Sequence, residues 1–225
     1  MSMSHKVKIQ SLGFITHDVI QVQTDKPANY SYTPGQATEV AMDLEGWRDE
    51  KRPFTFTSLP DEGFLQFTIK IYPDHDGVTD RLQRLEPGAN LLLEDPWGAI
   101  SYQGPGVFLA GGAGVTPFIA IFKDLARKGQ LAENILLFAN KREKDIIMES
   151  QFEQWLGQDF INILSEERSP KHAQGHIDKD FIKEHTTQTD KYVYLCGPPP
   201  MMDSVQADLH ALGIDQNKIV TEDLS

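Results

Sequence analysis

Glycines gather in one short stretch of the sequence, residues 108–117, which reads FLAGGAGVTP. An apolar strand precedes them and a helix is expected to follow, and glycines in that position let a backbone approach a phosphate closely. The free amides and positive dipole end of the helix would favour the same negative charge. The stretch predicts a nucleotide site, with an ordinary strand-to-helix turn as the alternative. Its spacing is not that of the Rossmann GxGxxG motif.

A second turn of the same kind lies near the end of the chain. Cys196 and Gly197, followed by three prolines, come after an apolar strand and before a helix. Ligands of doubly wound sheets bind outside the carboxyl ends of the strands, so the two turns would border one cleft. Cys196 alone is more often a small buried apolar residue than a reactive one. Its place at this edge favours a role in the site.

A third candidate is residues 52–58, RPFTFTS, which combine a cation, aromatic rings and hydroxyls in one strand. Alternation puts Arg52 and Phe54 on one face and Thr55 on the other. From the pattern alone, an ordinary aromatic strand with an exposed arginine is the better interpretation.

The elements that must position these residues divide the chain into two halves. Up to about residue 102 the apolar runs are short, and turn-forming residues separate six strands, which predicts an antiparallel barrel or sandwich. One short helix, which Thr79 can cap, interrupts them. The strands are expected at residues 6–15, 18–24, 36–44, 53–59, 64–72 and 90–94.

After residue 104 strands alternate with helices, the pattern of a parallel sheet covered on both faces. We therefore predict two domains, an antiparallel six-stranded barrel over residues 1–102 and a parallel α/β domain over residues 103–225. The second domain is expected to have strands at 106–110, 134–139, 160–164, 192–196 and 218–220, and helices at 116–128, 147–156, 178–184 and 200–212.

Composition narrows the possible partners and cofactors. The 33 acidic and 21 basic residues give a net charge of −12, which disfavours non-specific binding to nucleic acid. The one cysteine cannot form an internal disulfide, a cysteine-ligated iron–sulfur cluster or a multi-cysteine zinc site. No stretch approaches the ~20 apolar residues of a membrane span, and the N-terminus lacks an apolar signal core. A cytoplasmic protein without metal, nucleic acid or membrane partner is expected.

Taken together, the motifs resemble those of the ferredoxin–NADP reductase superfamily, which joins a flavin-binding barrel to a nucleotide-binding α/β domain. They keep the family's order over nearly the whole chain. In this sequence they are PGQ at 34–36, RPFT at 52–55 where the family has Arg-x-Tyr-Ser, GVTDRL at 77–82, GGAGVTP at 111–117, the segment 140–147, and CGPP at 196–199.

The resemblance implies a flavin site in the barrel. Arg52 would pair with the flavin phosphate, for which a guanidinium is well shaped, and Thr79 would hold the same group. Phe54 would pack on the isoalloxazine ring in place of the usual tyrosine, and Thr55 would hydrogen-bond the nitrogen that accepts hydride. The further flavin contacts implied are Pro53, Ile69, Lys70, Ile71, Gly77 and Val78.

The resemblance also implies a nicotinamide nucleotide site at the edge of the parallel sheet. Thr116 would lie between flavin and nicotinamide, Cys196 would lie near the nicotinamide carbon that donates hydride, and Glu222 matches an acidic residue of the family. Thr55, Cys196 and Glu222 are thus the expected catalytic residues. The other implied contacts are Gly111, Gly112, Gly114, Val115, Pro117, Asn140, Lys141, Arg142, Gly197, Pro198 and Pro199.

These expectations describe an NAD(P)H-dependent reductase that passes hydride to FAD, with FMN less expected, and then electrons to an acceptor such as ferredoxin or flavodoxin. The reductase component of an oxygenase and a non-catalytic flavin- or nucleotide-binding regulatory module are the alternatives. Lys141 and Arg142 could meet the ribose phosphate of NADPH, or could simply be solvated, so NADH and NADPH both stay open. The chain ends in TEDLS without a terminal aromatic, so nicotinamide should reach the ring with less displacement.

Overall fold

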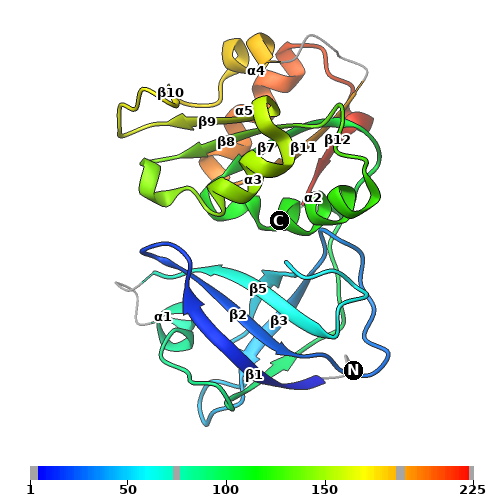
Figure 1. The fold of residues 1–225 in the computed structure, drawn as a ribbon, viewed down its shortest axis with the longest axis vertical. Helices are drawn as coiled ribbons and strands as arrows, with labels where there is room; N and C mark the ends of the chain where they lie inside the picture. The colour runs from blue at the N-terminus through cyan, green and yellow to red at the C-terminus, as the bar shows by residue number, and fades with distance from the viewer. Residues whose placement is uncertain (1–4, 73–76, 186–190, 223–225) are drawn as a thin grey trace.

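Two six-stranded sheets, one antiparallel and one parallel, form the lower and upper halves of the molecule in Figure 1. The computed structural model describes residues 5–72, 77–185 and 191–222. Both predicted sheet types are confirmed. Within the described residues, no helix has the length and apolar character needed to cross a membrane.

The antiparallel sheet curls into a nearly closed barrel. An isolated bridge between Phe56 and Phe67 joins the two edges of the sheet, and both rings are fully buried inside it. The sheet has the order β4-β3-β6-β1-β2-β5. Its strands are β1 (His5–Phe14), β2 (Val19–Asp25), β3 (Ala37–Met42), β4 (Arg52–Thr55), β5 (Phe64–Lys70) and β6 (Asn90–Leu93), which confirms the six predicted strands.

A short helix, α1 (Val78–Leu82), lies between β5 and β6. The prediction that Thr79 caps it is wrong, because Gly77 occupies the N-cap position and no side chain caps the helix. The Thr79 hydroxyl instead accepts a long hydrogen bond of 3.4 Å from the amide of Tyr72. Thr79 therefore lies one residue inside the helix.

The parallel sheet has the order β10-β9-β8-β7-β11-β12. Its strands are β7 (Gly106–Gly111), β8 (Ile135–Asn140), β9 (Phe160–Leu164), β10 (Ala173–Gln174), β11 (Tyr192–Cys196) and β12 (Ile219–Thr221). Five of these were predicted. The two-residue strand β10 was not, because a period of two cannot be recognised in so short a segment.

Helices cover both faces of this sheet, as predicted. They are α2 (Thr116–Lys128), α3 (Glu149–Leu156), α4 (Lys179–His185) and α5 (Pro199–Ala211). Successive side chains of β7 point to opposite faces of the sheet and enter two separate apolar clusters. Phe108 belongs to the cluster that contains Phe118 and Phe152, and Leu109 belongs to the cluster that contains Val205. Short 3-10 turns complete the half: η2 (Gly112–Val115), η3 (Glu143–Asp145), η4 (Gly157–Asp159) and η5 (Gln216–Lys218).

The connection between the two sheets is held by a buried tyrosine of β11. The Tyr194 hydroxyl accepts hydrogen bonds from the amides of Gln103 and Gly104 and donates one of 2.7 Å to the Gly104 carbonyl. Its ring stacks on Phe108 with the centroids 4.1 Å apart. Burial raises the pKa of Tyr194 to about 12, so the hydroxyl stays a neutral donor and acceptor.

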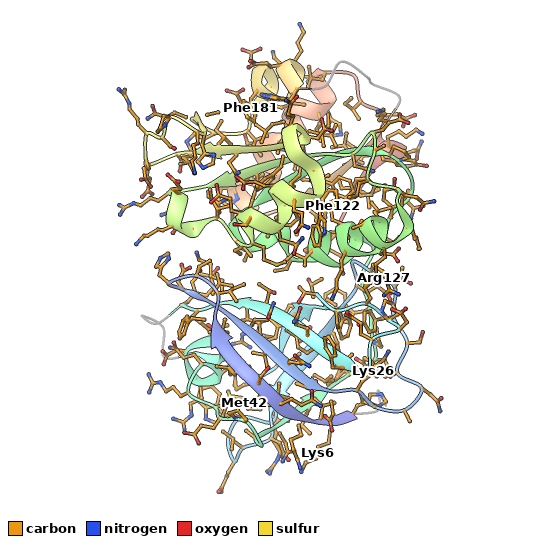
Figure 2. All side chains as sticks on the ribbon, in the orientation of Figure 1. Lys6, Lys26, Met42, Phe122, Arg127 and Phe181 are labelled. Carbon is orange, nitrogen blue, oxygen red and sulfur yellow. The ribbon has the colours of Figure 1, made fainter. Side chains whose placement is uncertain are left out.

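Two ion pairs join α2 to the loop between β4 and β5 of the barrel. Arg127, labelled in Figure 2, makes two hydrogen bonds of 2.8 and 2.6 Å to the carboxylate of Asp61. Lys123 lies 2.8 Å from Glu62. The hydrogen bonds and charge of Arg127 hold the pKa of Asp61 below its usual value. These contacts link α2 of the parallel half to the barrel.

Candidate functional site

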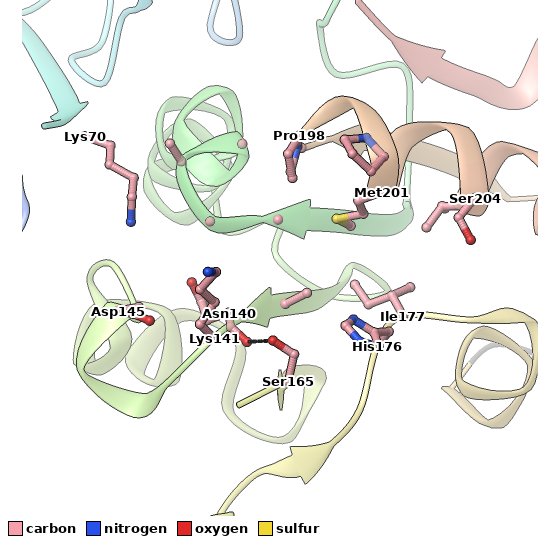
Figure 3. Close-up of a pocket in the computed structure, with 18 of the residues that line it drawn as sticks. Lys70, Asn140, Lys141, Asp145, Ser165, His176, Ile177, Pro198, Met201 and Ser204 are labelled. Atoms are coloured by element: carbon pink, nitrogen blue, oxygen red, sulfur yellow. Dashed lines mark hydrogen bonds between the residues drawn. The ribbon is translucent and has the colours of Figure 1, made fainter. Parts of the chain in front are cut away.

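A cleft of about 730 Å³ opens at the carboxyl edge of the parallel sheet. The order of the strands reverses between β7 and β11, which is where doubly wound sheets bind ligands. The barrel contributes to the same cleft through Lys70, at the end of β5, and Tyr72. In Figure 3 the Lys70 side chain reaches toward the part of the cleft formed by Asn140, Lys141 and Asp145.

The glycines of both turns make the floor of this cleft from backbone. A Cβ at Gly114 would overlap the carbonyl oxygen of Cys196, and one at Gly197 would come within 2.9 Å of the sulfur of Met201. A Cβ at Gly111 would overlap the same sulfur and come within 2.9 Å of Cδ of Pro198. The two predicted turns are therefore in direct contact and do border one cleft.

The opening of α2 follows the glycine turn directly. Gly112 has φ +51°, a conformation that favours glycine, and has open space where its side chain would be. Pro117 lies in the first turn of α2, as predicted, and Thr116 at its first position is largely buried. Val115 packs into the core beside α2, so it positions the turn rather than lining the cleft.

A buried amide in the cleft is left without a partner. Asn140, the last residue of β8, lines the cleft, and among the described residues its side-chain nitrogen has no hydrogen-bond acceptor. The backbone carbonyl of Asn140 accepts hydrogen bonds from the amide and from the hydroxyl of Ser165. The bond from the hydroxyl is drawn in Figure 3. Buried donors are normally paired, so this one fits a nucleotide that brings an acceptor.

The two cations beyond β8 are both turned to one carboxylate. Lys141 lies 3.0 Å and Arg142 3.7 Å from opposite oxygens of Glu166, which follows β9. All three side chains are largely exposed. The neighbouring Glu167 accepts a hydrogen bond of 2.9 Å from the amide of Glu143. The expected binding region for a ribose phosphate therefore already contains the negative charges of Glu166 and Glu167.

The flavin residues implied for the barrel lie together on β4 but have few fixed partners. The Arg52 guanidinium is exposed, donates a 2.6 Å hydrogen bond to the carbonyl of Lys51 and lies 3.6 Å from Glu50. Phe54 packs partly against the barrel core, and Thr55 is half-buried. Pro53 is exposed beside them. An exposed guanidinium on the same strand as an aromatic ring and a hydroxyl fits a flavin phosphate and ring.

The rest of the implied flavin set lies on β5 and at α1. Ile69 and Ile71 are buried in the barrel core, so they can offer only backbone to a ligand. Lys70 between them points outward and lies 2.7 Å from Asp18. Burial works to raise the pKa of Asp18, but hydrogen bonding and charge from Lys70, with a contribution from His17, lower it overall.

Cys196 is a neutral thiol at the edge of the parallel sheet. Burial, together with the charge of Glu222, raises the pKa of Cys196 to about 12. It therefore offers a compact, uncharged group beside the glycine turn rather than a nucleophile.

Glu222 binds the connection between the two halves. Its carboxylate accepts hydrogen bonds from the amide of Ala99, at 2.9 and 3.1 Å, and from that of Ile100 at 3.0 Å. It does so from just beyond β12, which pairs with β11, the strand that ends at Cys196. The carboxylate thus positions the connection between barrel and sheet.

Several cleft residues escaped the sequence analysis. Ser165, His176 and Ser204 line the cleft but belong to no motif of recognisable spacing, and Asp145 and Met201 lie within or next to quoted segments without having been singled out. Within the sequence, the available indication was that several of them follow a predicted strand or begin a predicted helix. Such positions lie at the carboxyl edge of a parallel sheet. Glu166 and Asp18 act by pairing with the predicted cations, and such pairing across the chain leaves no local pattern.

Comparisons with known proteins agree with this architecture. Residues 3–101 match the family model of an FAD-binding domain, and residues 108–207 match that of the oxidoreductase NAD-binding domain. NADH-cytochrome b5 reductase 2 of Mycosarcoma maydis is 30% identical over 84% of this chain and 60% of its own length. The xylene/toluene monooxygenase electron transfer component XylA of Pseudomonas putida is 24% identical over 92% of this chain and 62% of its own length. The chain thus spans about three fifths of these two relatives.

Solved structures share the whole fold. The flavohem-like FAD/NAD binding domain of a nitric oxide dioxygenase from Vibrio cholerae superposes with a TM-score of 0.85 at 22% identity, covering 96% of this chain and 97% of that one. The ferredoxin NADP+ reductase from Neisseria gonorrhoeae, solved with bound FAD and NADP, gives 0.84 at 16% identity, covering 99% of both chains.

Fold and cleft define a two-domain protein in which a flavin-binding barrel faces a nicotinamide-nucleotide-binding sheet. The chain belongs to the ferredoxin–NADP reductase superfamily, with an FAD-binding and an NAD-binding domain. The resemblance seen in the sequence is confirmed, as is FAD rather than FMN.

Proposed function

We propose that this chain is an NAD(P)H-dependent flavoprotein reductase that takes hydride from a nicotinamide nucleotide and passes electrons to an acceptor protein. One observation carries the proposal: a single cleft is lined by the end of a barrel strand, at Lys70, and by the glycine turns of the parallel sheet. We place the flavin domain at residues 1–102 and the nucleotide domain at residues 103–225, a division supported by the strands that each sheet uses.

The residues would divide the work as follows. Arg52 and the hydroxyl of Thr79 bind the flavin phosphate, while Phe54 and Thr55 contact the ring and its hydride-accepting nitrogen. The backbone from Gly111 to Gly114 and that of Gly197 hold the diphosphate of the nucleotide. The bound flavin supplies the redox chemistry itself.

The protein's contribution is orientation. Holding the nicotinamide between Thr116 and Cys196 against the flavin would turn a bimolecular transfer into an internal one, which can lower a barrier by up to ~7–11 kcal/mol. The neutral thiol of Cys196 allows close packing and adds no charge beside the reacting carbon. In the reductase, Glu222 acts through the amides of Ala99 and Ile100, as a positioning residue.

The preferred coenzyme is NADH. Glu166 engages both cations that could read a ribose 2′-phosphate, and its own charge would repel that phosphate. A carboxylate at the end of a neighbouring strand can instead accept hydrogen bonds from the ribose hydroxyls of NADH. Curated relatives named as NADH-cytochrome b5 reductase and nitrate reductase [NADH] support this choice.

The acceptor is a protein that takes one electron at a time. The relatives named as cytochrome b5 reductases support a haem protein, and the monooxygenase electron transfer component XylA supports an oxygenase component. Ferredoxin or flavodoxin is the third candidate. A steady-state assay compares cytochrome b5, an oxygenase component, and ferredoxin or flavodoxin as acceptors.

The decisive experiment is anaerobic addition of NADH to the purified yellow protein. Rapid bleaching of the flavin band is expected, because the cleft brings the nucleotide turns to the barrel. A flavin that stays oxidised with both NADH and NADPH would favour the non-catalytic binding module. A protein that is colourless and takes up no added FAD would contradict the proposal altogether.

Coenzyme choice has its own test in Glu166→Gln. Removing this charge frees Lys141 and Arg142, so kcat/KM for NADPH should rise about tenfold, equivalent to about 1.4 kcal/mol, while that for NADH changes little. Glu153→Gln, an exposed residue of α3, is the matched control. If the ratio of NADH to NADPH activity is the same in all three proteins, Glu166 does not select the coenzyme.

A further inference from the structure

Three metal-ligating side chains come together outside the cleft. Glu143 belongs to η3, Glu149 is the first residue of α3, and His172 directly precedes β10. One ligand atom from each lies within 4.8 Å of the other two. None of the three has a place in the proposed reductase chemistry.

Two of these atoms are buried and make no hydrogen bond within the described residues. The His172 side chain is 6% exposed and that of Glu149 25% exposed. His172 Nε2 and Glu149 Oε1 lie 3.2 Å apart, within ion-pair distance, yet among the described residues neither atom makes a hydrogen bond of acceptable geometry. Buried polar atoms normally form well-aligned hydrogen bonds, so this poorly aligned contact fits a site in which a third group binds both atoms.

We propose that Glu143, Glu149 and His172 form a binding site for a divalent cation of the zinc class. Zinc takes imidazole nitrogen and carboxylate oxygen at about 2.0–2.2 Å in a tetrahedral arrangement, which places two ligand atoms roughly 3.3–3.4 Å apart. The 3.2 Å between His172 Nε2 and Glu149 Oε1 is close to that spacing. A water molecule would complete the four ligands. Magnesium and calcium prefer sites made of oxygen alone.

A cation here would fasten two segments that carry the coenzyme-reading residues. Glu143 lies in the connection from β8 to α3, which begins at Lys141 and Arg142, and Glu149 is the first residue of α3. His172 belongs to the connection from β9 to β10, which contains Glu166. The hydrogen bond from the Glu143 amide to Glu167 already links the same two segments. The cation would stiffen both.

A second cluster of similar residue types serves as an internal comparison. His17, Asp18 and Asp145 also lie within 4.8 Å of one another. Asp18, however, is held by Lys70 at 2.7 Å, and the His17 side chain is 42% exposed. Within the described residues, this cluster lacks a buried imidazole nitrogen without a hydrogen bond, which distinguishes His172.

The test is calorimetric titration of the FAD-loaded protein with zinc chloride. We expect about one equivalent to bind, and Glu149→Gln and His172→Ala should each weaken binding at least about tenfold. Tetrahedral cobalt(II) should give visible absorption bands that His172→Ala removes. His210→Ala, an exposed residue of α5, and His17→Ala are matched controls and should bind as the native protein does.

Several outcomes would overturn the proposal. These are no zinc binding, binding that survives both His172→Ala and Glu149→Gln, loss of binding in His17→Ala instead, or equal binding of magnesium. Glu149→Gln preserves the shape of the side chain, so flavin content and Tm can show that the variant is folded before its zinc binding is compared. The readout needs no hydride transfer, so its failure and that of the reductase proposal are distinguishable.

Discussion

The nucleotide half and the flavin half build their sites from different parts of the chain. At the edge of the parallel sheet, the glycine turns line the cleft with backbone, and a Cβ at Gly114 would overlap the backbone carbonyl of Cys196. On β4 of the barrel the corresponding surface is made of side chains, with Arg52 exposed and Thr55 half-buried.

This difference concerns preorganisation. A backbone site packed against a second turn has its shape before any ligand arrives, so little order remains to be imposed on binding. An exposed arginine loses rotamer freedom when it binds, at a cost of up to ~1.5–2 kcal/mol. Substitutions in the nucleotide half should therefore change the geometry of the site and lower the rate of flavin reduction. Substitutions in the flavin half should mainly weaken the affinity for FAD.

The largest effect is expected for Gly114→Ala. The new Cβ would meet the backbone carbonyl of Cys196, which cannot move without displacing the second turn. A displacement of about 1 Å can lower a rate about 10²-fold, so flavin reduction by NADH should fall at least that much. Stopped-flow bleaching measures it, and bound FAD should be retained. Gly13→Ala, on an exposed part of β1 with no neighbouring atom within 4 Å, is the control. A normal rate in Gly114→Ala would show that the turn yields easily.

A smaller effect is expected for Arg52→Ala. Losing charged hydrogen bonds worth about 1.5–3 kcal/mol should weaken FAD binding about ten- to a hundredfold. Arg52→Lys should restore part of it, because lysine keeps the charge without the planar fork. Flavin fluorescence titration of the apoprotein gives the Kd. Arg48→Ala, whose exposed guanidinium pairs with Asp43 at 2.7 Å, should leave FAD binding unchanged. Equal FAD affinity in Arg52→Ala and Arg48→Ala would remove Arg52 from the flavin site.

The same difference explains what could be predicted from the sequence. Glycines mark tight turns, and both turns follow strands of a parallel sheet, so the sequence predicted that residues 111–114 and Gly197 border one cleft. The barrel residues were indicated only by family resemblance, because RPFT is also an ordinary β-strand. Strand and helix positions followed from apolar periodicity, which fails for a two-residue strand such as β10.

What the sequence could not show were contacts between distant segments. Glu166 lies 24 to 25 positions from the cations that it pairs with, and Glu222 lies more than 120 from the amides that it binds. Charged residues are common at such positions, and only the fold brings particular ones together. Thr79 was misplaced for a local reason, since glycine and threonine both precede or cap helices and Gly77 occupies the N-cap.

The smallest effect is expected for Glu222→Gln, which spans both halves. Its carboxylate holds the amides of Ala99 and Ile100, and its charge helps to raise the pKa of Cys196. A raised thiol pKa favours the protonated form in the folded state. The associated stability is therefore complete below pH 9, the ordinary value, and is lost as the pH rises toward 12.

Glutamine keeps one acceptor without the charge, so the free energy of unfolding should fall by about 0.5–1.5 kcal/mol. Alkylation of Cys196 by iodoacetamide at pH 8 should become faster, by less than about tenfold, since burial still keeps most of the thiol protonated. Glu86→Gln, exposed in the barrel, is the control for both measurements. If Glu222→Gln behaves like this control, burial alone sets the thiol pKa, and the connection is held by Tyr194 without help from the end of β12.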